Sequence, residues 1–331
     1  MIALSPQNQA IILSALALLL DFFNGLHGNS NVVATMIASR AMSGRSALLL
    51  ASVATIAAPF IFGVAVAETI GRGIVDPGIV DARIITAALV GAIAWSLVTW
   101  YLGIPSSSSH ALLGGLMGSV LVGRGVEYVQ SPGLLKTALA LLVSPFAGML
   151  AGYVLMRIVL FLCRAASPKV NRFFKRGQLL TALALALSFG ANSGQRGMGI
   201  IAMSLVSLGL QDVFMVPLWA ILACGGAIAL GTCIGGSRII KTVGSKIYRV
   251  RTVHGFVSQA AAAGVILGAG AFGGPVSATQ VISSTVMGVG SAERLSRVRW
   301  GVVGQILLTW LTTIPASAAI AALLCSILQR V

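Results

Sequence analysis

Four polar segments interrupt the apolar stretches of this chain, and their side chains could bind a small charged solute. Two segments are rich in hydroxyl groups: residues 103–110, with the sequence GIPSSSSH, and residues 273–280, with the sequence GGPVSATQ. Two others are rich in amides: residues 24–31, with the sequence NGLHGNSN, and residues 189–195, with the sequence FGANSGQ. The start of a helix carries partial positive charge and free backbone N–H groups, to which Ser and Thr hydroxyls add donors. The segments therefore indicate a site for an oxyanion.

The candidate solute ligands are the hydroxyl, amide and imidazole side chains of these segments. We expect substrate contacts from Asn24, His27, Asn31, Ser106, Ser107, Ser108, Asn192, Gln195, Ser277 and Thr279. Hydroxyls at a helix start are also ordinary N-caps, and amides within a membrane also bond neighbouring helices. The repetition of the hydroxyl segments and the clustering of the amides favour binding over these two alternatives.

Asp21 is the only acid deep in the first apolar stretch, and an intramembrane carboxylate is a functional candidate by default. It could bind a cation, carry a proton, or form a salt bridge to a neighbouring helix. We expect ion coupling from Asp21 together with Asn29 and Ser193, with H⁺ or Na⁺ as the ion. Arg196 fits either an anion contact or an anchor near the membrane surface, and the sequence does not separate these two roles.

The composition predicts that these segments lie within a lipid membrane. Of the 331 residues, 57% are hydrophobic and 9% are charged, whereas soluble domains have about 25% charged residues. A soluble core of this length could not bury so much apolar surface, which excludes a typical soluble enzyme, a disordered chain and a disulfide scaffold. Because a helix needs ~20 apolar residues to cross a bilayer, the long apolar stretches predict an all-α polytopic membrane protein.

The formal net charge of +15 does not indicate nucleic acid. The basic residues lie mostly in short breaks between apolar stretches, without interleaved aromatic residues, as is typical of cytoplasmic membrane loops. The expected partners are therefore the lipid bilayer and an inorganic oxyanion. No Cys or His spacing typical of a metal site is present, so we expect neither a metal nor a cofactor.

The polar segments form two pairs, which predict an internal duplication. The hydroxyl segments begin at residues 103 and 273, an offset of 170, and aligning His27 with Asn192 gives an offset of 165. Two kinds of segment that repeat in the same order at nearly one offset divide the chain into two membrane repeats. We place the first repeat at residues 1–165, the second at 177–331, and a basic cytoplasmic linker at 166–176.

Loop charges predict that the two repeats have opposite orientations. The loop around Arg40 and Arg45 is basic, whereas its counterpart around Asp212 is not. Residues 68–83 carry three acids, whereas their counterpart carries only basic charges, at Arg238, Lys241, Lys246, Arg249 and Arg251. Under the positive-inside rule, equivalent loops then lie on opposite sides, which is the inverted repeat of many secondary transporters.

The lengths fit about five transmembrane helices in each repeat (5+5), with broken helices or hairpins at the midplane. Whether residues 105–122 and 275–291 cross the membrane or form arms of re-entrant hairpins stays open. In this arrangement the basic loops face the cytoplasm and both termini lie outside. A homo-oligomer is compatible with the sequence, which leaves the oligomeric state open.

Several motifs together resemble the PiT family of inorganic phosphate transporters. Residues 24–35 and 190–197 are similar to the two signatures of that family, and residues 105–112 and 275–279 are similar to its two Pro-Ser/Thr segments. Residues 231–244 also resemble the family. The resemblance covers nearly the whole chain and implies an inverted-repeat carrier that moves phosphate with H⁺ or Na⁺.

The chain departs from the family pattern at two signature aspartates. Gly28 and Ser193 stand where the family usually has Asp, and Gln280 stands where it often has His. Because two membrane carboxylates are missing, cation coupling through them is not available to this divergent member, whereas Asp21 remains. Fewer negative charges would also ease the binding of a dianion.

These observations predict a secondary transporter of inorganic phosphate, cation-coupled and working by alternating access, in the plasma (inner) membrane of a prokaryote. A transporter of sulfate or another tetrahedral oxyanion is one alternative, and an uncoupled anion facilitator or channel is another. A membrane enzyme that uses Ser108 or Ser109 with His110 is disfavoured, because neighbouring residues on a helix do not face each other and no third group orients the His.

Overall fold

The protein is built from helices of very different lengths, several of them broken. The computed structural model describes residues 4–104, 106–167, 169–235 and 250–330, together with residues 243 and 247. Pro105 and the basic residues Arg238, Lys241, Lys246 and Arg249 lie outside the described residues. The described helices are α1 (Pro6–Asn24), η1 (Gly25–Asn29), α2 (Ser30–Ala38), α3 (Gly44–Phe62), α4 (Ala65–Arg72), α5 (Ala82–Leu102), α6 (Ser108–Gly123), η2 (Val126–Tyr128), α7 (Ser131–Leu162), α8 (Val170–Asn192), η3 (Ser193–Gln195), α9 (Arg196–Ser207), α10 (Leu218–Gly235), α12 (Thr252–Ala271), α13 (Ala278–Glu293), η5 (Leu295–Arg297) and α14 (Trp300–Arg330).

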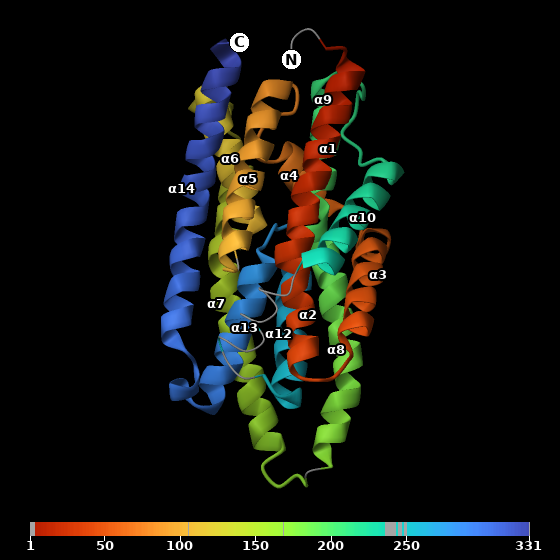
Figure 1. Ribbon diagram of the computed structural model, residues 1–331, viewed down its shortest axis with the longest axis vertical. Helices are drawn as coiled ribbons and strands as arrows, with labels where there is room; N and C mark the ends of the chain where they lie inside the picture. The colour runs from red at the N-terminus through yellow and green to blue at the C-terminus, as the bar shows by residue number, and fades with distance from the viewer. Residues whose placement is uncertain are drawn as a thin grey trace.

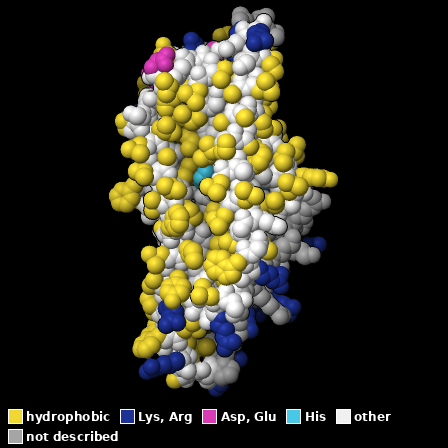
Figure 2. Space-filling model, turned by 90° about the vertical axis from the view of Figure 1, so that its left-hand side faces the viewer, with side chains coloured by type: hydrophobic (Ala, Val, Ile, Leu, Met, Phe, Trp, Pro, Cys, Tyr) yellow, Lys and Arg dark blue, Asp and Glu magenta, His cyan; other side chains and the backbone are white. Residues whose placement is uncertain are grey.

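The helices and the surface are those of an integral membrane protein. Six helical stretches of the described chain are long and apolar enough to span a membrane: Pro6–Ala38, Gly44–Phe62, Ala82–Leu102, Ser131–Leu162, Thr252–Ala271 and Trp300–Arg330. Hydrophobic side chains are spread over the visible face in Figure 2, and most of its Lys and Arg lie toward the lower end. The acidic side chains in this view lie at the upper end, beside a few Lys and Arg, and we call this the acidic end. The predicted all-α membrane fold is confirmed, and both termini lie at the same end of the molecule (Figure 1).

Each half begins with a helix that is broken near its middle. The first runs from α1 through the π-helical turn η1 into α2, and the second runs from α8 through the 3₁₀ turn η3 into α9. In Figure 1, α1 lies above α2, whereas α8 lies below α9, so the two runs are antiparallel. Helix α8 begins at Val170, inside the segment predicted as a linker, because that segment is rich in Lys and Arg, which are good helix formers.

Glycine at the first break lets two backbones approach closely. A Cβ atom on Gly25 would lie 2.1 Å from the carbonyl oxygen of Ile228 on α10, and one on Gly231 would lie 2.0 Å from that of Phe22. Small residues at such contacts are the usual means by which membrane helices associate, since lipid gives no hydrophobic driving force. The broken helix is therefore held against α10 at the level of the polar segment.

Two helical hairpins contain the segments 105–122 and 275–291, whose crossing of the membrane the sequence left open. Helices α5 and α6 form one hairpin and α12 and α13 form the other, and each hairpin enters and leaves at the same end of the molecule. The base of the first is closed by a β-bridge between Val75 and Val129 and by Gln130 N–H donating to Ile74 O at 2.9 Å. The base of the second is closed by Arg299 N–H donating to Ile247 O at 3.1 Å.

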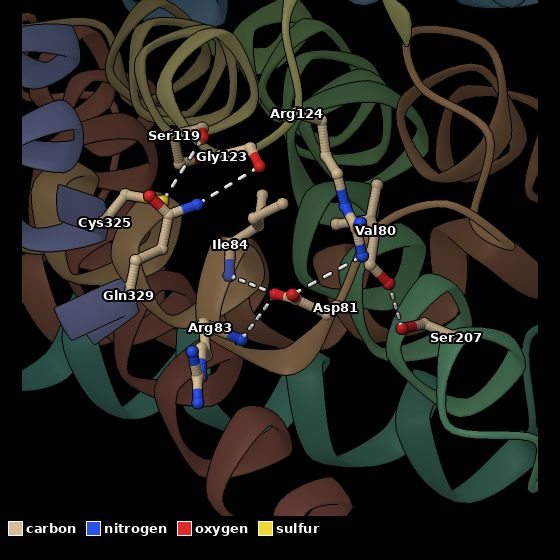
Figure 3. Close-up of polar contacts among 10 residues, drawn as sticks. All are labelled: Val80, Asp81, Arg83, Ile84, Ser119, Gly123, Arg124, Ser207, Cys325 and Gln329. Atoms are coloured by element: carbon tan, nitrogen blue, oxygen red, sulfur yellow. Dashed lines mark hydrogen bonds and ion pairs between the residues drawn. The ribbon is translucent and has the colours of Figure 1, made fainter. Parts of the chain in front are cut away.

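The base of the first hairpin lies at the acidic end of the molecule and is tied to its neighbours (Figure 3). Asp81 caps α5 by accepting hydrogen bonds from the backbone of Arg83 and Ile84, both at 3.0 Å, and lies 3.6 Å from Arg124 after α6. The Ser207 hydroxyl at the end of α9 donates to Val80 O. These contacts fix the outer ends of α5 and α6, so that the hairpin tip is the part left to line a site.

The two hairpins correspond closely at an offset of 170 residues. Gly103 directly follows α5 and Gly273 is the second residue after α12, and their φ values of 67° and 64° lie in the left-handed region that glycine adopts without strain. Each short helix then packs against the long helix of the other half, α6 on α14 and α13 on α7. Gly118 and Gly288 allow these contacts, because a Cβ atom on either would lie about 2 Å from a carbonyl oxygen of the facing helix.

The apolar core has two parts, and the polar segments lie between them. One part joins buried residues of α2, α3, α8, α12 and α13, and the other joins buried residues of α1, α4, α5, α6 and α9. The breaks at η1 and η3 and the tips of both hairpins fall where these two parts meet. Chain breaks at this depth are tolerated because other helices cover them.

Candidate functional site

The hairpin tips are shaped by two equivalent serine caps. The Ser107 hydroxyl accepts a hydrogen bond from the His110 N–H at 3.2 Å, and the Ser277 hydroxyl accepts one from the Gln280 N–H at 3.3 Å. Both serines are buried and have extended backbones. A capping hydroxyl that accepts from the helix can still donate its own proton, so both can serve as N-caps and as donors to an anion.

The two tips touch each other at the centre of the molecule, and a buried arginine lies between them. The Ser109 hydroxyl of the first hairpin donates to Val276 O of the second at 3.3 Å. The guanidinium of Arg196, at the start of α9, donates from Nη2 to the same Val276 O at 3.3 Å and from Nη1 to the Ser108 hydroxyl. Arg196 thus bridges both hairpins and is only 3% exposed.

Two asparagines attach the broken helices to this centre. Asn24 Nδ2 donates to Ser193 O at 2.8 Å, and Asn24 Oδ1 accepts from Ser108 at 2.9 Å and from Arg196 at 3.2 Å. Asn192 Nδ2 donates to Gly274 O at 2.9 Å, while its Oδ1 accepts from the Val276 N–H at 3.0 Å. The first asparagine therefore belongs to the central cluster, and the second holds the tip of the second hairpin.

Gly28 and Ser193, which stand where the family pattern has Asp, have different surroundings. A Cβ atom on Gly28 would lie 2.5 Å from the ring of Phe189, so a side chain there would require the buried ring to move. The Ser193 hydroxyl accepts from Arg196 Nη2 at 2.7 Å. We define the central cluster as Asn24, Ser108, Ser193 and Arg196, whose side chains are joined by hydrogen bonds.

Asp21 of α1 lies beside the central cluster and faces the start of α9. It is fully buried, and a Cβ atom on Gly197 would lie 2.1 Å from its Oδ2. Its carboxylate faces the Cys224 thiol, Arg196 and the Gly197 backbone. Neither oxygen has a hydrogen-bond partner of normal geometry among the described residues. A buried carboxylate with so little solvation is costly as an anion.

Four other candidate residues lie along the first broken helix and the first tip. His27 Nε2 lies 3.3 Å from the Thr99 hydroxyl, and Asn31 Nδ2 donates to His27 O at 2.7 Å. Asn29 Nδ2 donates to the hydroxyls of Thr232 (3.0 Å) and Thr55 (3.3 Å). Ser106 Oγ lies 3.3 Å from the hydroxyl of Thr313 on α14. Asn29 and Ser106 thus bond neighbouring helices in this conformation.

Gln195 acts as a cap for another helix. Its Oε1 accepts from Val66 N–H at 3.0 Å and Ala67 N–H at 3.1 Å, both in the first turn of α4, and its Nε2 donates to Gly63 O at 2.6 Å. Its amide oxygen and nitrogen are therefore both engaged away from the central cluster. Thr279 lies buried in the first turn of α13.

The Ser–His pairs considered for a membrane enzyme are not formed. The Ser108 hydroxyl donates to Asn24, the Ser109 hydroxyl donates to Val276 O, and His110 Nδ1 instead lies 2.7 Å from the Ser107 hydroxyl. The hydroxyls of Ser108 and Ser109 are thus engaged within the central cluster and across the two tips.

The centre is closed in this conformation. The cavity beside Arg196 and Ser109 has a volume of ≈ 10 Å³, which is room for about one water. Its wall on the acidic side of the molecule is aliphatic except for Thr137, and its other members are Ile70, Ile74, Leu112, Leu113, Leu116 and Leu141. A tetrahedral oxyanion therefore needs the tips to separate before it can enter.

Arg196 lies at the centre, although the sequence alone does not separate an anion contact from an anchor near the membrane surface. A signal was present, because Arg196 directly follows the polar segment ending at Gln195 and no acid lies near it in sequence. Only the fold shows that the 3₁₀ turn η3 aims Gln195 at α4 and Arg196 at the hairpin tips.

Comparison with known proteins identifies relatives over nearly the whole chain. The model of the phosphate transporter family matches residues 24–167 and 163–321. A protein of Rhizobium meliloti (strain 1021) named "probable low-affinity inorganic phosphate transporter" is 45% identical over 94% of both chains. A protein of Bacillus subtilis (strain 168) with the same name is 39% identical over 97% of both chains. A solved structure titled "The sodium-dependent phosphate transporter" is similar with a TM-score of 0.87 at 26% identity, covering 98% of this chain and all of the other.

Proposed function

Because the chain belongs to the phosphate transporter family, we propose that it carries inorganic phosphate across the plasma membrane and binds it between the two hairpin tips. The transported ion would lie at the central cluster, midway between the ends of an integral membrane protein. No bond of the substrate is made or broken in this process. The protein's task is to replace the water around a tetrahedral anion and to expose the anion to each side in turn.

The buried guanidinium of Arg196 is the observation that carries this proposal. No described carboxylate lies within 4.0 Å of it, so its charge has no directly bonded counter-ion. A buried charge without such a partner is strongly destabilising. A phosphate ion supplies that partner, and its oxygens suit the planar donor pattern of a guanidinium.

The hairpin tips supply the remaining donors. When the tips separate, the contacts of Arg196 with Ser108 and Val276 are the ones that an oxyanion would replace. The hydroxyls of Ser107 and Ser277 and the free N–H groups at the starts of α6 and α13 then surround the anion from two sides. Asn24 and Asn192 hold the breaks in place, so we assign them mainly positioning roles.

We infer that the coupling ion is H⁺, carried by Asp21. Sodium requires several oxygen ligands, whereas this carboxylate faces a thiol, a guanidinium and a glycine backbone. A proton needs only the carboxylate itself and removes the cost of a buried anion. A side chain at position 28 would meet Phe189, and Ser193 is bonded to Arg196, so neither position supplies an acid for a metal ion.

The proposed transport cycle uses two inverted repeats, residues 1–165 and 177–331, joined by the linker at 166–176. Its support is the correspondence at an offset of 170 between the turns at Gly103 and Gly273 and between the caps at Ser107 and Ser277. The antiparallel runs α1–α2 and α8–α9 in Figure 1 fit the same symmetry. Equivalent hairpins that open alternately would expose the centre to one side and then to the other.

Uptake of labelled phosphate into proteoliposomes tests the function and its coupling. We expect uptake that an imposed inward H⁺ gradient stimulates and a Na⁺ gradient does not, and that arsenate inhibits more strongly than sulfate. Asp21→Asn should remove the H⁺ dependence, with Asp76→Asn, an exposed acid in the loop after α4, as the matched control. Sulfate uptake at an equal rate would favour the general oxyanion transporter, and uptake indifferent to both gradients would favour the uncoupled facilitator.

A further inference from the structure

A row of polar side chains leads from the central cluster toward the basic end of the molecule. On the first broken helix, Asn31, Thr35 and Ser39 follow one another at four-residue spacing, so they lie on one face. All three are buried, and α2 packs against α8 and α12 as well as α3. We define the inner seam as Asn31, Thr35, Ser39, Gln178, Thr181 and Gln259.

Hydrogen bonds across the inner seam form two layers that join the two halves of the chain. In the first layer, Gln259 of α12 donates to the Thr35 hydroxyl at 3.1 Å and accepts from the Thr181 hydroxyl of α8 at 2.7 Å. In the second layer, the Ser39 hydroxyl donates to Gln178 Oε1 at 3.0 Å. Each layer therefore closes the space between α2 and the second half with a few side-chain bonds that water could replace.

The inner seam also contains polar groups that the closed conformation does not satisfy. Asn31 Oδ1 and Gln178 Nε2 are buried and have no hydrogen-bond partner among the described residues. A buried polar group without a partner is costly, because it gives up its hydrogen bonds to water and gains none in return. Such groups within a membrane domain are expected where a water-filled path forms in another conformation.

A basic cavity lies where the inner seam ends, beside Ser39 and Gln178 and farthest from the central cluster. It has a volume of ≈ 420 Å³ and is lined by Ala41, Met42, Arg172, Lys175, Arg176 and Leu179. Its three cationic side chains are exposed, and none forms an ion pair within 4.0 Å with a described carboxylate. The cavity therefore concentrates anions at the end of the molecule that the positive-inside rule assigns to the cytoplasm.

We propose that the inner seam opens as the path between the central cluster and the cytoplasm, with the basic cavity as its mouth. This inference rests on the proposed function for the identity of the anion. The layer of Thr35, Thr181 and Gln259 is the gate nearer the central cluster. The layer of Ser39 and Gln178 is the gate nearer the cytoplasm. The cavity wall on the opposite side of the central cluster contains one such polar side chain, Thr137, whose hydroxyl has no hydrogen-bond partner among the described residues, but no row of them.

Cysteine accessibility tests the path in the full-length protein with its four native cysteines replaced by Ala. Thr35→Cys and Ser39→Cys probe the two gates, and Ser119→Cys is the matched control, because Ser119 is also buried but lies near the acidic end of α6. The probe is a membrane-impermeant, negatively charged methanethiosulfonate added to inverted vesicles. We expect both seam variants to react at least ~10-fold faster than Ser119→Cys, and faster than in right-side-out vesicles.

Phosphate uptake is measured in the same vesicles, which separates the two proposals. If uptake is normal and neither seam variant reacts faster than the control, the path is wrong and the transport function stands. If both seam variants react from the basic side but phosphate is not taken up, the path stands and its cargo is another anion. Two seam variants are needed because either one alone could fail to fold.

Removing the positive charges of the basic cavity tests whether this cavity is the mouth of the path. In the Ser39→Cys variant, replacing Arg172, Lys175 and Arg176 together with Gln should lower the ratio of anionic to neutral reagent rates at the introduced thiol by roughly 10-fold. Replacing Arg164 and Lys169 with Gln instead removes charge from the neighbouring chain outside the cavity lining and should leave that ratio within about twofold. An unchanged ratio in the triple Gln variant would show that the basic cavity is not the mouth.

Discussion

Replacing Arg196 with Gln removes the buried charge between the hairpin tips and keeps an amide that can still donate a hydrogen bond. In the closed conformation the guanidinium donates to Asn24, Ser108, Ser193 and Val276 O. When phosphate takes the place of some of these acceptors, its negative charge is buried against Arg196. Losing the partner of such a buried charge costs about 2–5 kcal/mol, which is a roughly 30-fold to 4000-fold rise in Kd.

The variant Arg196→Lys shows how much of the phosphate affinity depends on the positive charge at this position and how much on the planar guanidinium. Lysine keeps the positive charge but cannot reproduce the planar pair of donors. The loss of one charge-assisted hydrogen bond, about 1.5–3 kcal/mol, predicts a roughly tenfold to hundredfold rise in Kd. The two variants should therefore rank in the order wild type, Lys, Gln.

Thermal unfolding of the purified protein at increasing phosphate concentration provides the assay. The unfolding temperature without phosphate reports what each substitution does to the fold. The further rise with phosphate reports binding alone, because a ligand at 100 times its Kd stabilises by about 2.7 kcal/mol. Arg157→Gln on the exposed side of α7 is the control and should keep the wild-type response. A Kd for Arg196→Gln within about threefold of wild type would refute the assignment of Arg196 to the phosphate site.

Three further predictions rest on individual contacts. Ser107→Ala together with Ser277→Ala removes both hairpin caps, so we expect about 1 kcal/mol of lost stability for each and loss of phosphate uptake; uptake at the wild-type rate would exclude these hydroxyls from the site. Gln195→Ala leaves two N–H groups of α4 without acceptors and should destabilise by about 1–3 kcal/mol. The phosphate Kd of Gln195→Ala should stay unchanged, and a higher Kd would show that Gln195 contributes to phosphate binding. Ser193→Asp places a carboxylate beside Arg196 and should weaken phosphate binding at least ~10-fold; unchanged binding would contradict the proposed anion position.

The membrane class, the four polar breaks and their pairing follow from the order of the residues alone. Composition and apolar stretches are properties of the chain alone, and Pro, Gly and hydroxyl residues mark helix starts locally. For this reason the caps at Ser107 and Ser277 and the turns at Gly103 and Gly273 lie where the sequence indicates them. The assignment of these side chains to phosphate remains a prediction for the uptake experiments.

Which polar side chains face the centre depends on how the helices fold and pack. Successive helical residues point about 100° apart, so the π-helical turn η1 and the 3₁₀ turn η3 redirect everything that follows them. This is why Gln195 caps α4 while its neighbour Arg196 reaches the hairpin tips. The bond between Thr35 and Gln259, 224 residues apart, likewise depends on how helices of the two halves pack, and no local pattern in the sequence contains that information.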